Sequence, residues 1–477
     1  MRVTWALWMI AGCGSGKSEP AQDSVGAHDG STEAVSDTAS PDEEAITDYR
    51  SAKWCAECHP TQYAEWEQSM HRYAAHSPVF DAMAAKAFQD TAGATGTFCT
   101  GCHTPLGTMD GEPGTTVAAD RSEISLEGVT CVVCHQAVAY DVPIGNTSIT
   151  IDLDAPIQGV FGSSNVKGHQ SMKSEVLDTP ELCGSCHDVF NFPGLRIEEA
   201  YTEYTESPAA AAGIRCQDCH MGPTPGVPSE RPVGAAAHTP GAENPERSLA
   251  SHRFIGPDYS MIDTFPYEDD PAASAAAQAE MRTQTETLLK NAVHIADVQL
   301  DETESLSELR ITVESLTTGH HVPTGFTSER QLWLSVDVLN GGEVVWQTGD
   351  LDTYGDLRDE LSWEVMAGTV LLDEQLVNFQ SKNLVRAGIE TLERGELDVL
   401  DTVFPFDATY ISRNSLRPLE ARQLVYSLPA LPAEAEVRVR LRYRNLPPYI
   451  LRALHLDELI ERLQIVDIDE VYLGATR

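Results

Sequence analysis

Basic residues are scarce in this chain of 477 residues, and their scarcity excludes two kinds of partner. Lysine and arginine number 32 against 73 aspartate and glutamate, which gives a formal net charge of −41. Nucleic acids and anionic lipid surfaces attract basic faces, so neither is an expected partner. The sequence also lacks any apolar run of roughly 18 residues, the length that a membrane-spanning helix needs.

Cysteine is absent after Cys13 except within one repeated pattern. The pattern is Cys-x-x-Cys-His, the attachment signature of c-type haem. Residue frequencies predict about 0.008 copies by chance, whereas the chain contains five. The cysteines are Cys55 and Cys58, Cys99 and Cys102, Cys131 and Cys134, Cys183 and Cys186, and Cys216 and Cys219.

The spacing of this pattern suits haem chemistry. Two thiols add to the two vinyl groups of one haem, and the next residue directs an imidazole at the iron. A zinc knuckle would need four ligands in paired spacing, and a disulfide would not require the histidine. We therefore expect five covalently attached haem c groups. Their proximal iron ligands are predicted to be His59, His103, His135, His187 and His220.

The N-terminus predicts export and a lipid anchor. Residues 3–11 form a short, mostly apolar run that ends in Ile10-Ala-Gly-Cys13, which resembles a bacterial lipobox. Residues 1–12 would then be a signal peptide and Cys13 the lipidated mature N-terminus; the alternative is a cysteine that happens to end a short leader. Covalent haem attachment outside the bacterial cytoplasm agrees with export. Gly14, in place of aspartate, favours an outer-membrane lipoprotein in the periplasm or on the cell surface.

The rest of the chain divides by composition. Residues 13–48 are acidic and poor in apolar residues, which predicts a disordered tether that carries the lipidated cysteine. Residues 49–262 hold all five motifs and predict a mainly α or irregular domain with a haem-dominated core. Strong helix formers over residues 263–290 predict a connecting helix. One further helix is expected over residues 60–71, and another over residues 451–463.

Residues 291–477 change to a period of two, which predicts an all-β sandwich domain. Alternation is clear over residues 310–316, 332–338 and 437–443. Asn340-Gly-Gly342 predicts a hairpin turn before a strand over residues 343–347. The arginines that alternate along residues 438–444 are expected to form a solvated strand face; the alternative is that they pair with acidic neighbours or haem propionates.

The second axial ligand of each iron decides between electron transfer and substrate chemistry. Two strong ligands close the iron, whereas an open position admits a substrate. Met109 and Met221 are weaker thioether candidates. Ten histidines lie outside the motifs: His28, His71, His76, His169, His238, His252, His294, His320, His321 and His455.

Several segments resemble the cytochrome c-554 and hydroxylamine-oxidoreductase superfamily over about residues 49–260. They are Trp54-Cys-Ala-Glu-Cys-His-Pro60 with Trp66-Glu-Gln-Ser-Met-His71, Glu181-Leu-Cys-Gly-Ser-Cys-His-Asp188 with His169 upstream, Arg215-Cys-Gln-Asp-Cys-His-Met221, and Ser251-His-Arg-Phe254. The resemblance implies that His71, His169 and His252 are distal haem ligands. The C-x-x-C-K haem motif of the ammonia-forming nitrite reductases in this superfamily does not occur here.

The segment Gly319-His-His-Val-Pro-Thr-Gly325 resembles the G-H-x-x-P-T-G turn of sandwich domains that follow multihaem domains. His320 occupies the histidine of that motif, so the resemblance implies a distal ligand donated by the β domain; the alternative is a turn histidine bonded to backbone. The fifth distal ligand stays open between His76, His238, His321 and an open iron.

These features favour a lipid-anchored pentahaem c-type cytochrome with mostly bis-histidine haems, in a respiratory or extracellular electron-transfer chain. Its acidic surface predicts redox partners with basic docking surfaces. One alternative is a reductase of a small nitrogen or sulfur oxyanion, which needs one open iron. Another is that the sandwich serves as a partner-docking or adhesion module, which is compatible with electron transfer.

Overall fold

The computed structural model describes residues 48–161, 168–239, 244–302, 306–386 and 399–474, and residues 46–477 form one compact unit. Cys13, the expected lipobox and almost all of the expected tether lie outside the described residues. Within the described part, no helix has the length and apolar character needed to cross a membrane.

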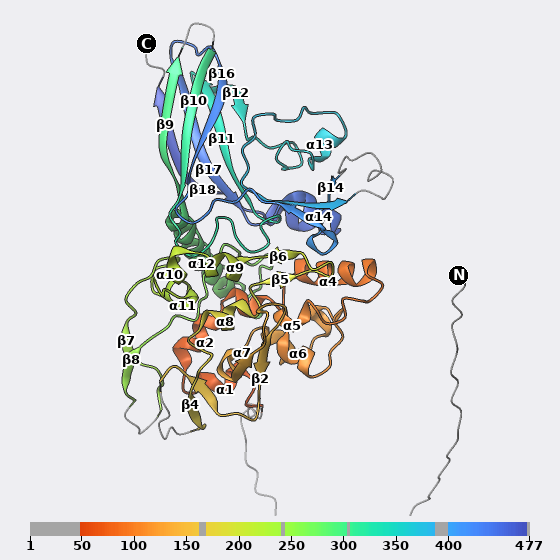
Figure 1. Cartoon of the computed structure of the whole chain (residues 1–477), viewed down its shortest axis with the longest axis vertical. Coiled ribbons are helices and arrows are strands. Elements are labelled where there is room, and N and C mark those ends of the chain that lie inside the picture. The colour runs from red at the N-terminus through yellow and green to blue at the C-terminus, as the bar shows by residue number, and fades with distance from the viewer. Residues whose placement is uncertain (1–47, 162–167, 240–243, 303–305, 387–398, 475–477) are drawn as a thin grey trace, which may run out of the picture. The chain divides into compact units, whose positions relative to one another are not determined.

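The first half of the described chain consists of short helices joined by long loops (Figure 1). Proline begins five of these helices, because its fixed φ suits the first helical position. The helices are α1 (Ala52–Ala56), α2 (Pro60–Glu67), α3 (Met70–Tyr73), α4 (Pro78–Asp90), α5 (Thr100–His103), α6 (Pro105–Met109), η1 (Ala118–Asp120), η2 (Ser125–Glu127), α7 (Cys131–His135), α8 (Pro180–Gly184), α9 (Ala200–Thr205), α10 (Pro208–Ala211) and α11 (Cys216–His220).

Four small two-stranded sheets lie among these helices. They pair β1 (Ala137–Tyr140) with β2 (Ile149–Ile151), β3 (Ile157–Gly159) with β4 (Ser171–Lys173), β5 (Val189–Phe190) with β6 (Arg196–Glu198), and β7 (Val233–Ala235) with β8 (Glu246–Ser248). The strands have two to four residues each, too short for a sheet core of their own. This agrees with the expected α or irregular region.

The helix expected over residues 60–71 is broken. α2 ends at Glu67, and Ser69 begins α3 as an N-cap whose hydroxyl accepts a hydrogen bond from the Arg72 amide. Ser69 has extended backbone (φ −76°, ψ 161°), so the chain changes direction there. The capping preference of serine outweighs the apolar spacing and sets a separate direction for His71 on α3.

The structure has one long helix in the segment expected to connect the two regions, α12 (Pro271–Ala292), which begins eight residues after the expected start at residue 263. Asp270 caps it by accepting a hydrogen bond from the Ala273 amide, and Pro271 occupies its first position. Ala277, Met281 and Leu288 are buried along one face, at helical spacing. The helix continues directly into the first long strand, so it ties the helical region to the β region.

Two of the sheets that the described residues form in the β region share one apolar core. The sheets are β16 (Ala421–Pro429), β10 (Leu306–Ser315) and β9 (Val293–Glu302), and β12 (Glu343–Thr348), β11 (Gln331–Asn340), β17 (Ala435–Arg444) and β18 (Val466–Gly474), in these orders (Figure 1). All neighbours are antiparallel. Ile311 on β10 and Leu334 and Val439 on β11 and β17 are fully buried in the same cluster. The expected β-sandwich arrangement follows from this shared core.

The predicted hairpin connects β11 to β12. Asn340 pairs with Glu343, and Gly341 and Gly342 between them have φ values of 61° and 85°. Both central residues of a type I′ turn need positive φ, which glycine adopts without steric cost. The turn therefore matches the prediction.

Smaller elements complete the β region. They are α13 (Trp363–Met366), β13 (Lys382–Arg386), β14 (Val399–Asp401), η4 (Pro405–Asp407), β15 (Tyr410–Ser412), α14 (Pro448–Ala453) and η5 (Asp457–Arg462). The single helix expected over residues 451–463 is wrong. α14 and η5 are separated at His455, whose φ of 58° interrupts helical backbone.

The arginines of β17 do not form the solvated face that was expected. Arg438 and Arg440 both donate to one carboxylate oxygen of Asp337 on the neighbouring strand, at 2.8–3.0 Å. Arg442 donates to Asp467 at 2.7 Å, and Arg444 is buried. The alternative with acidic neighbours is therefore correct for three of the four arginines, because opposite charges lie directly across the ladder.

Asp337→Ala should destabilise the sandwich strongly. The Asp337 side chain is 5% exposed and serves two partly buried arginines, so its loss leaves two guanidinium groups unpaired. We expect a loss of about 3 kcal/mol in the free energy of unfolding, measured by urea unfolding followed by circular dichroism. Asp467→Ala is the matched control: this side chain is 46% exposed, so we expect less than about 1 kcal/mol. Equal effects of the two variants would contradict the prediction.

Candidate functional site

Each Cys-x-x-Cys-His motif lies on or beside a single helical turn. α7 and α11 consist of the third and fifth motifs, and α5 ends at His103. Residues i, i+3 and i+4 share one helix face, so both thiols and the imidazole of a motif point to the same side. The ten cysteines in the described residues are all outside disulfides. This donor set suits a haem attached by two thioethers and bound through one imidazole.

Hydrogen bonds fix the orientation of four of the five motif histidines. Because the carbonyl or carboxylate oxygens at Nδ1 only accept, the proton of each neutral ring is on Nδ1, and the lone pair is on Nε2. Nε2 is therefore the nitrogen available to a metal. The Nδ1 donors and their acceptors are His59 to Ala236 (2.7 Å), His135 to Gln158 (2.8 Å), His220 to Ile255 (3.1 Å) and His187 to the Glu198 carboxylate (3.2 Å).

These motif histidines each face a second histidine. A metal–imidazole bond is about 2.0 Å, and each ring centre lies about 1.1 Å from its nitrogen, so two imidazoles on opposite sides of one metal have centres about 6.2 Å apart. The ring spacings therefore fit one iron between each pair. Among the described residues the pairs are His59 with His169 (6.4 Å), His187 with His71 (6.3 Å), His135 with His252 (6.3 Å) and His220 with His320 (6.1 Å).

The second histidine of three pairs has the same tautomer as the first. Nδ1 of His169, His252 and His320 lies 2.9–3.1 Å from a local backbone carbonyl. In each of these three pairs, both rings therefore have an unprotonated Nε2 that can bind a metal between them. These three residues and His71 are the ones that the resemblances implied as distal ligands, and the structure brings each of the four to a different motif.

Burial favours the neutral form of three of the histidines outside the motifs. It lowers the pKa of His71 to about 3 and the pKa values of His252 and His320 to about 4. His187 differs: its side chain is 55% exposed, and although desolvation acts to lower its pKa, the hydrogen bond and charge of Glu198 raise it. Neutral imidazoles are the form that binds iron.

His103 is the motif histidine without a facing histidine among the described residues. Its Nδ1 is buried and makes no hydrogen bond within that part of the chain. Burial lowers the pKa of His103 to about 4, and the nearby Ala74 carbonyl opposes this lowering. The ring of Phe80, from α4, stacks on the His103 imidazole with centres 4.1 Å apart and planes at 6°. The ring face of His103 is therefore in contact with an apolar side chain.

The three histidines left open for the fifth distal position have other contacts. Nε2 of His76 lies 2.9 Å from the Leu126 carbonyl. The amide of His238 donates to the Cys58 carbonyl at 2.7 Å. Nδ1 of His321 lies 3.1 Å from the Ser415 hydroxyl and 3.1 Å from Glu203. In the described residues, none of the three forms a ring contact with His103.

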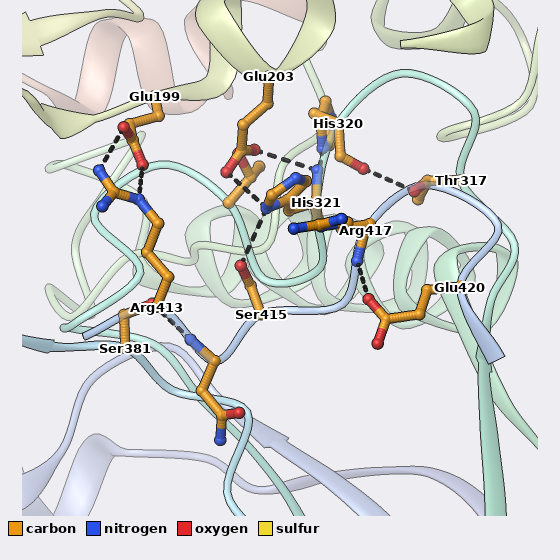
Figure 2. Close-up of polar contacts among 12 residues, drawn as sticks. Glu199, Glu203, Thr317, His320, His321, Ser381, Arg413, Ser415, Arg417 and Glu420 are labelled. Carbon is orange, nitrogen blue, oxygen red and sulfur yellow. Dashed lines mark hydrogen bonds and ion pairs between the residues drawn. The ribbon is translucent and has the colours of Figure 1, made fainter. Parts of the chain in front are cut away.

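The segment that carries His320 is held by α9 and α10 (Figure 2). Glu203 on α9 accepts hydrogen bonds from the His321 amide (3.1 Å) and the Thr324 hydroxyl (2.6 Å). The Ala209 amide at α10 donates to the Thr318 carbonyl at 3.0 Å. Burial raises the pKa of Glu203 to about 7. The helical region thus fixes the turn of the β region that places His320 opposite His220.

Cysteines of different motifs lie in contact. The third and fourth motifs are neighbours as well, because Cys134 lies within electrostatic range of Cys183 and Cys186. The fourth motif therefore borders three others, and the first borders the third. The contacting pairs, in which each thiol affects the pKa of the other, are Cys55 with Cys131, Cys102 with Cys186, and Cys183 with Cys216.

Comparisons with known proteins agree with this donor set. The family model for cytochrome c554 and c-prime matches residues 54–136, which include the first three motifs. A crystal structure of a penta-haem cytochrome c552 from Thermochromatium tepidum resembles the chain with a TM-score of 0.56 and 19% identity, over 89% of this chain and 98% of that one. The findings support a multihaem c-type cytochrome. The search of curated proteins returned no match.

The likeness to the cytochrome c552 establishes the fold, and its 89% coverage includes both the helical and the β regions. Covalently bound haem c is supported by both comparisons. The hydroxylamine-oxidoreductase part of the resemblance and the role of the G-H-x-x-P-T-G turn stay predictions.

Sequence reasoning missed three residues that contact the motif histidines or the segment that carries His320: Phe80, Glu198 and Glu203. Phe80 and Glu198 lie 23 and 11 residues from the histidines they contact. Glu203 contacts a turn 118 residues away. Nothing in the local sequence distinguishes these glutamates from the many others of an acidic chain.

Glu203→Ala should loosen the 317–324 segment. It leaves the His321 amide and the Thr324 hydroxyl without their acceptor, which should cost about 2 kcal/mol in the free energy of unfolding, measured by urea unfolding. Glu206→Ala is the control, because this side chain is exposed just after the same helix. If the two variants unfold at the same urea concentration, Glu203 does not hold the turn.

Proposed function

We propose that the chain is an electron-transfer protein that binds five haem c groups through its five Cys-x-x-Cys-His motifs. The four facing histidine pairs carry this proposal, because two imidazoles on one iron close it to substrates. Haem iron supplies a one-electron couple when bound. The chain supplies the thiols, the ligand orientation and an interior that limits contact with water.

In this proposal the axial ligands are the paired histidines described above. His59, His135, His187 and His220 are proximal, and His169, His252, His71 and His320 are distal, in that order. The Nδ1 hydrogen bonds of seven of these eight histidines would hold the rings in place, so that little rearrangement would accompany a change of charge at a bound metal. His320 makes the β region part of a haem site rather than a separate module.

The contacts between motifs support a continuous path. The first, third and fourth attachment sites are consecutive neighbours, and the second and fifth sites both adjoin the fourth. Electron transfer between sites needs such adjacency. The fourth site is accordingly the junction of the proposed path.

A second function is favoured by one observation at the His103 site. No histidine among the described residues faces His103, so its iron would have one open position. An open position is what a reductase of a small nitrogen or sulfur oxyanion requires. Electron transfer remains the main proposal, since the other four sites have closed donor sets.

Export and anchoring also belong to this proposal. The lipobox-like segment at Cys13 supports a bacterial lipoprotein at the outer membrane, in the periplasm or on the cell surface. The net charge of −41 supports redox partners with basic docking surfaces. The acidic segment over residues 13–48 would let the folded unit stand away from the membrane.

Electron paramagnetic resonance of the oxidised holoprotein, with carbon monoxide binding to the reduced form, tests both functions. We expect four low-spin haems and one high-spin haem that binds carbon monoxide. Five low-spin haems without carbon monoxide binding would remove the reductase alternative. Two or more high-spin haems would contradict the proposed histidine pairs.

His320→Ala should convert one low-spin haem to high-spin, because it removes the imidazole that faces His220. The measurement is the loss of one of the four low-spin signals at full haem content. His321→Ala is the matched control: the neighbouring ring contacts Ser415 and Glu203, so all four signals should remain (Figure 2). Loss of a signal in His321→Ala alone would exchange the roles of the two histidines.

A further inference from the structure

His187 differs from the other motif histidines in the partner of its Nδ1. His59, His135 and His220 donate to neutral backbone carbonyls, and His103 has no hydrogen bond there with a described residue. His187 donates instead to a carboxylate, Glu198 Oε1, at 3.2 Å. This is a difference in charge and not only in geometry.

Glu198 is placed for this contact by a short hairpin. It ends β6, where it pairs with Val189 on β5, two residues after His187. Its side chain is 9% exposed, so its charge is poorly screened by water. Arg196 on the same strand lies 3.5 Å from Asp188, which it pairs with. The guanidinium of Arg196 therefore pairs with Asp188 and not with Glu198.

The charge of Glu198 acts at the junction of the attachment sites. Its carboxylate lies within electrostatic range of Cys186 and of Cys102 and His103 in the second motif. Cys183 and Cys186 in turn contact the second and fifth motifs and lie near Cys134 of the third. Whatever Glu198 does to the fourth site thus affects the site through which the others connect.

A carboxylate that accepts the Nδ1 proton of a metal-bound histidine makes the imidazole more basic. A more basic ligand stabilises the oxidised metal more than the reduced metal, and a nearby negative charge acts in the same direction. Backbone carbonyls at the other three histidines have a weaker effect, since they carry no net charge.

We propose that Glu198 is a positioning residue that acts through His187 and makes the haem bound at Cys183 and Cys186 the last low-spin haem to be reduced. The inference rests on the proposed function, because it requires His187 and His71 to bind one iron. Electrons would then occupy the outer sites before the junction. The fourth site would serve as a step between sites and not as a store.

Glu198→Gln tests this in the full-length holoprotein. The glutamine amide oxygen still accepts from Nδ1, so ligation is retained while the charge is lost. A redox titration followed by electron paramagnetic resonance should show one low-spin haem with its midpoint potential shifted to more positive values. Haem content, measured by the pyridine haemochrome, should be unchanged.

Glu199→Gln is the matched control. It removes the same charge from the next residue, whose carboxylate pairs with Arg413 at 2.5 Å and contacts no motif histidine. We expect the four low-spin midpoints to keep their order in this variant. Equal shifts in both variants, or no low-spin shift in Glu198→Gln, would overturn the proposal.

The wild type gives a measurement that needs no variant. The low-spin signal with the most imidazolate-like g-values should belong to the haem reduced last, and the proposal fails if that haem is reduced first. If no low-spin midpoint potential shifts in Glu198→Gln, this inference is refuted and the proposed function is not. A wild type without bis-histidine low-spin signals would refute the proposed function itself.

Discussion

The spacing of about 6 Å between facing imidazoles is the constraint on which the rest of this structure depends. It requires two ring nitrogens to be free of protons and aimed at one point, and the Nδ1 hydrogen bonds satisfy this by holding the proton on the opposite side of each ring. Two of the four acceptors are backbone carbonyls of distant loops, Ala236 for His59 and Ile255 for His220. Loops without regular structure therefore have fixed positions, because they orient the ligands.

The β region takes part in this arrangement through one turn. Its sandwich core is independent of the motifs, with Ile311, Leu334 and Val439 buried between two sheets. The contact at Glu203 and the facing rings of His220 and His320 couple this rigid scaffold to the helical region. A histidine held on a sandwich turn has little freedom to move, so His320 keeps its position opposite His220.

The local patterns in the sequence were the reliable ones. The five motifs, α12, the alternating strands and the Gly341–Gly342 hairpin depend on residues close together in the chain, and the structure contains those elements as expected. Predictions that ignored local competition were wrong: Ser69 breaks the helix over residues 60–71 because its hydroxyl caps a new helix. The arginines of β17 are paired because Asp337 lies opposite them, on a strand about 100 residues away.

By itself the sequence determined where the five Cys-x-x-Cys-His motifs lie, and each motif places two thiols and an imidazole on one helix face. It also determined the strand faces of the sandwich, through alternation. Only the tertiary structure decided which histidine faces which motif, since the partners are 100 or more residues apart in all four pairs. It alone decided that His103 has no facing histidine in the described residues, and that Glu198 meets His187. Such contacts depend on long-range packing, where hydrogen bonds and burial act between segments that no local pattern relates.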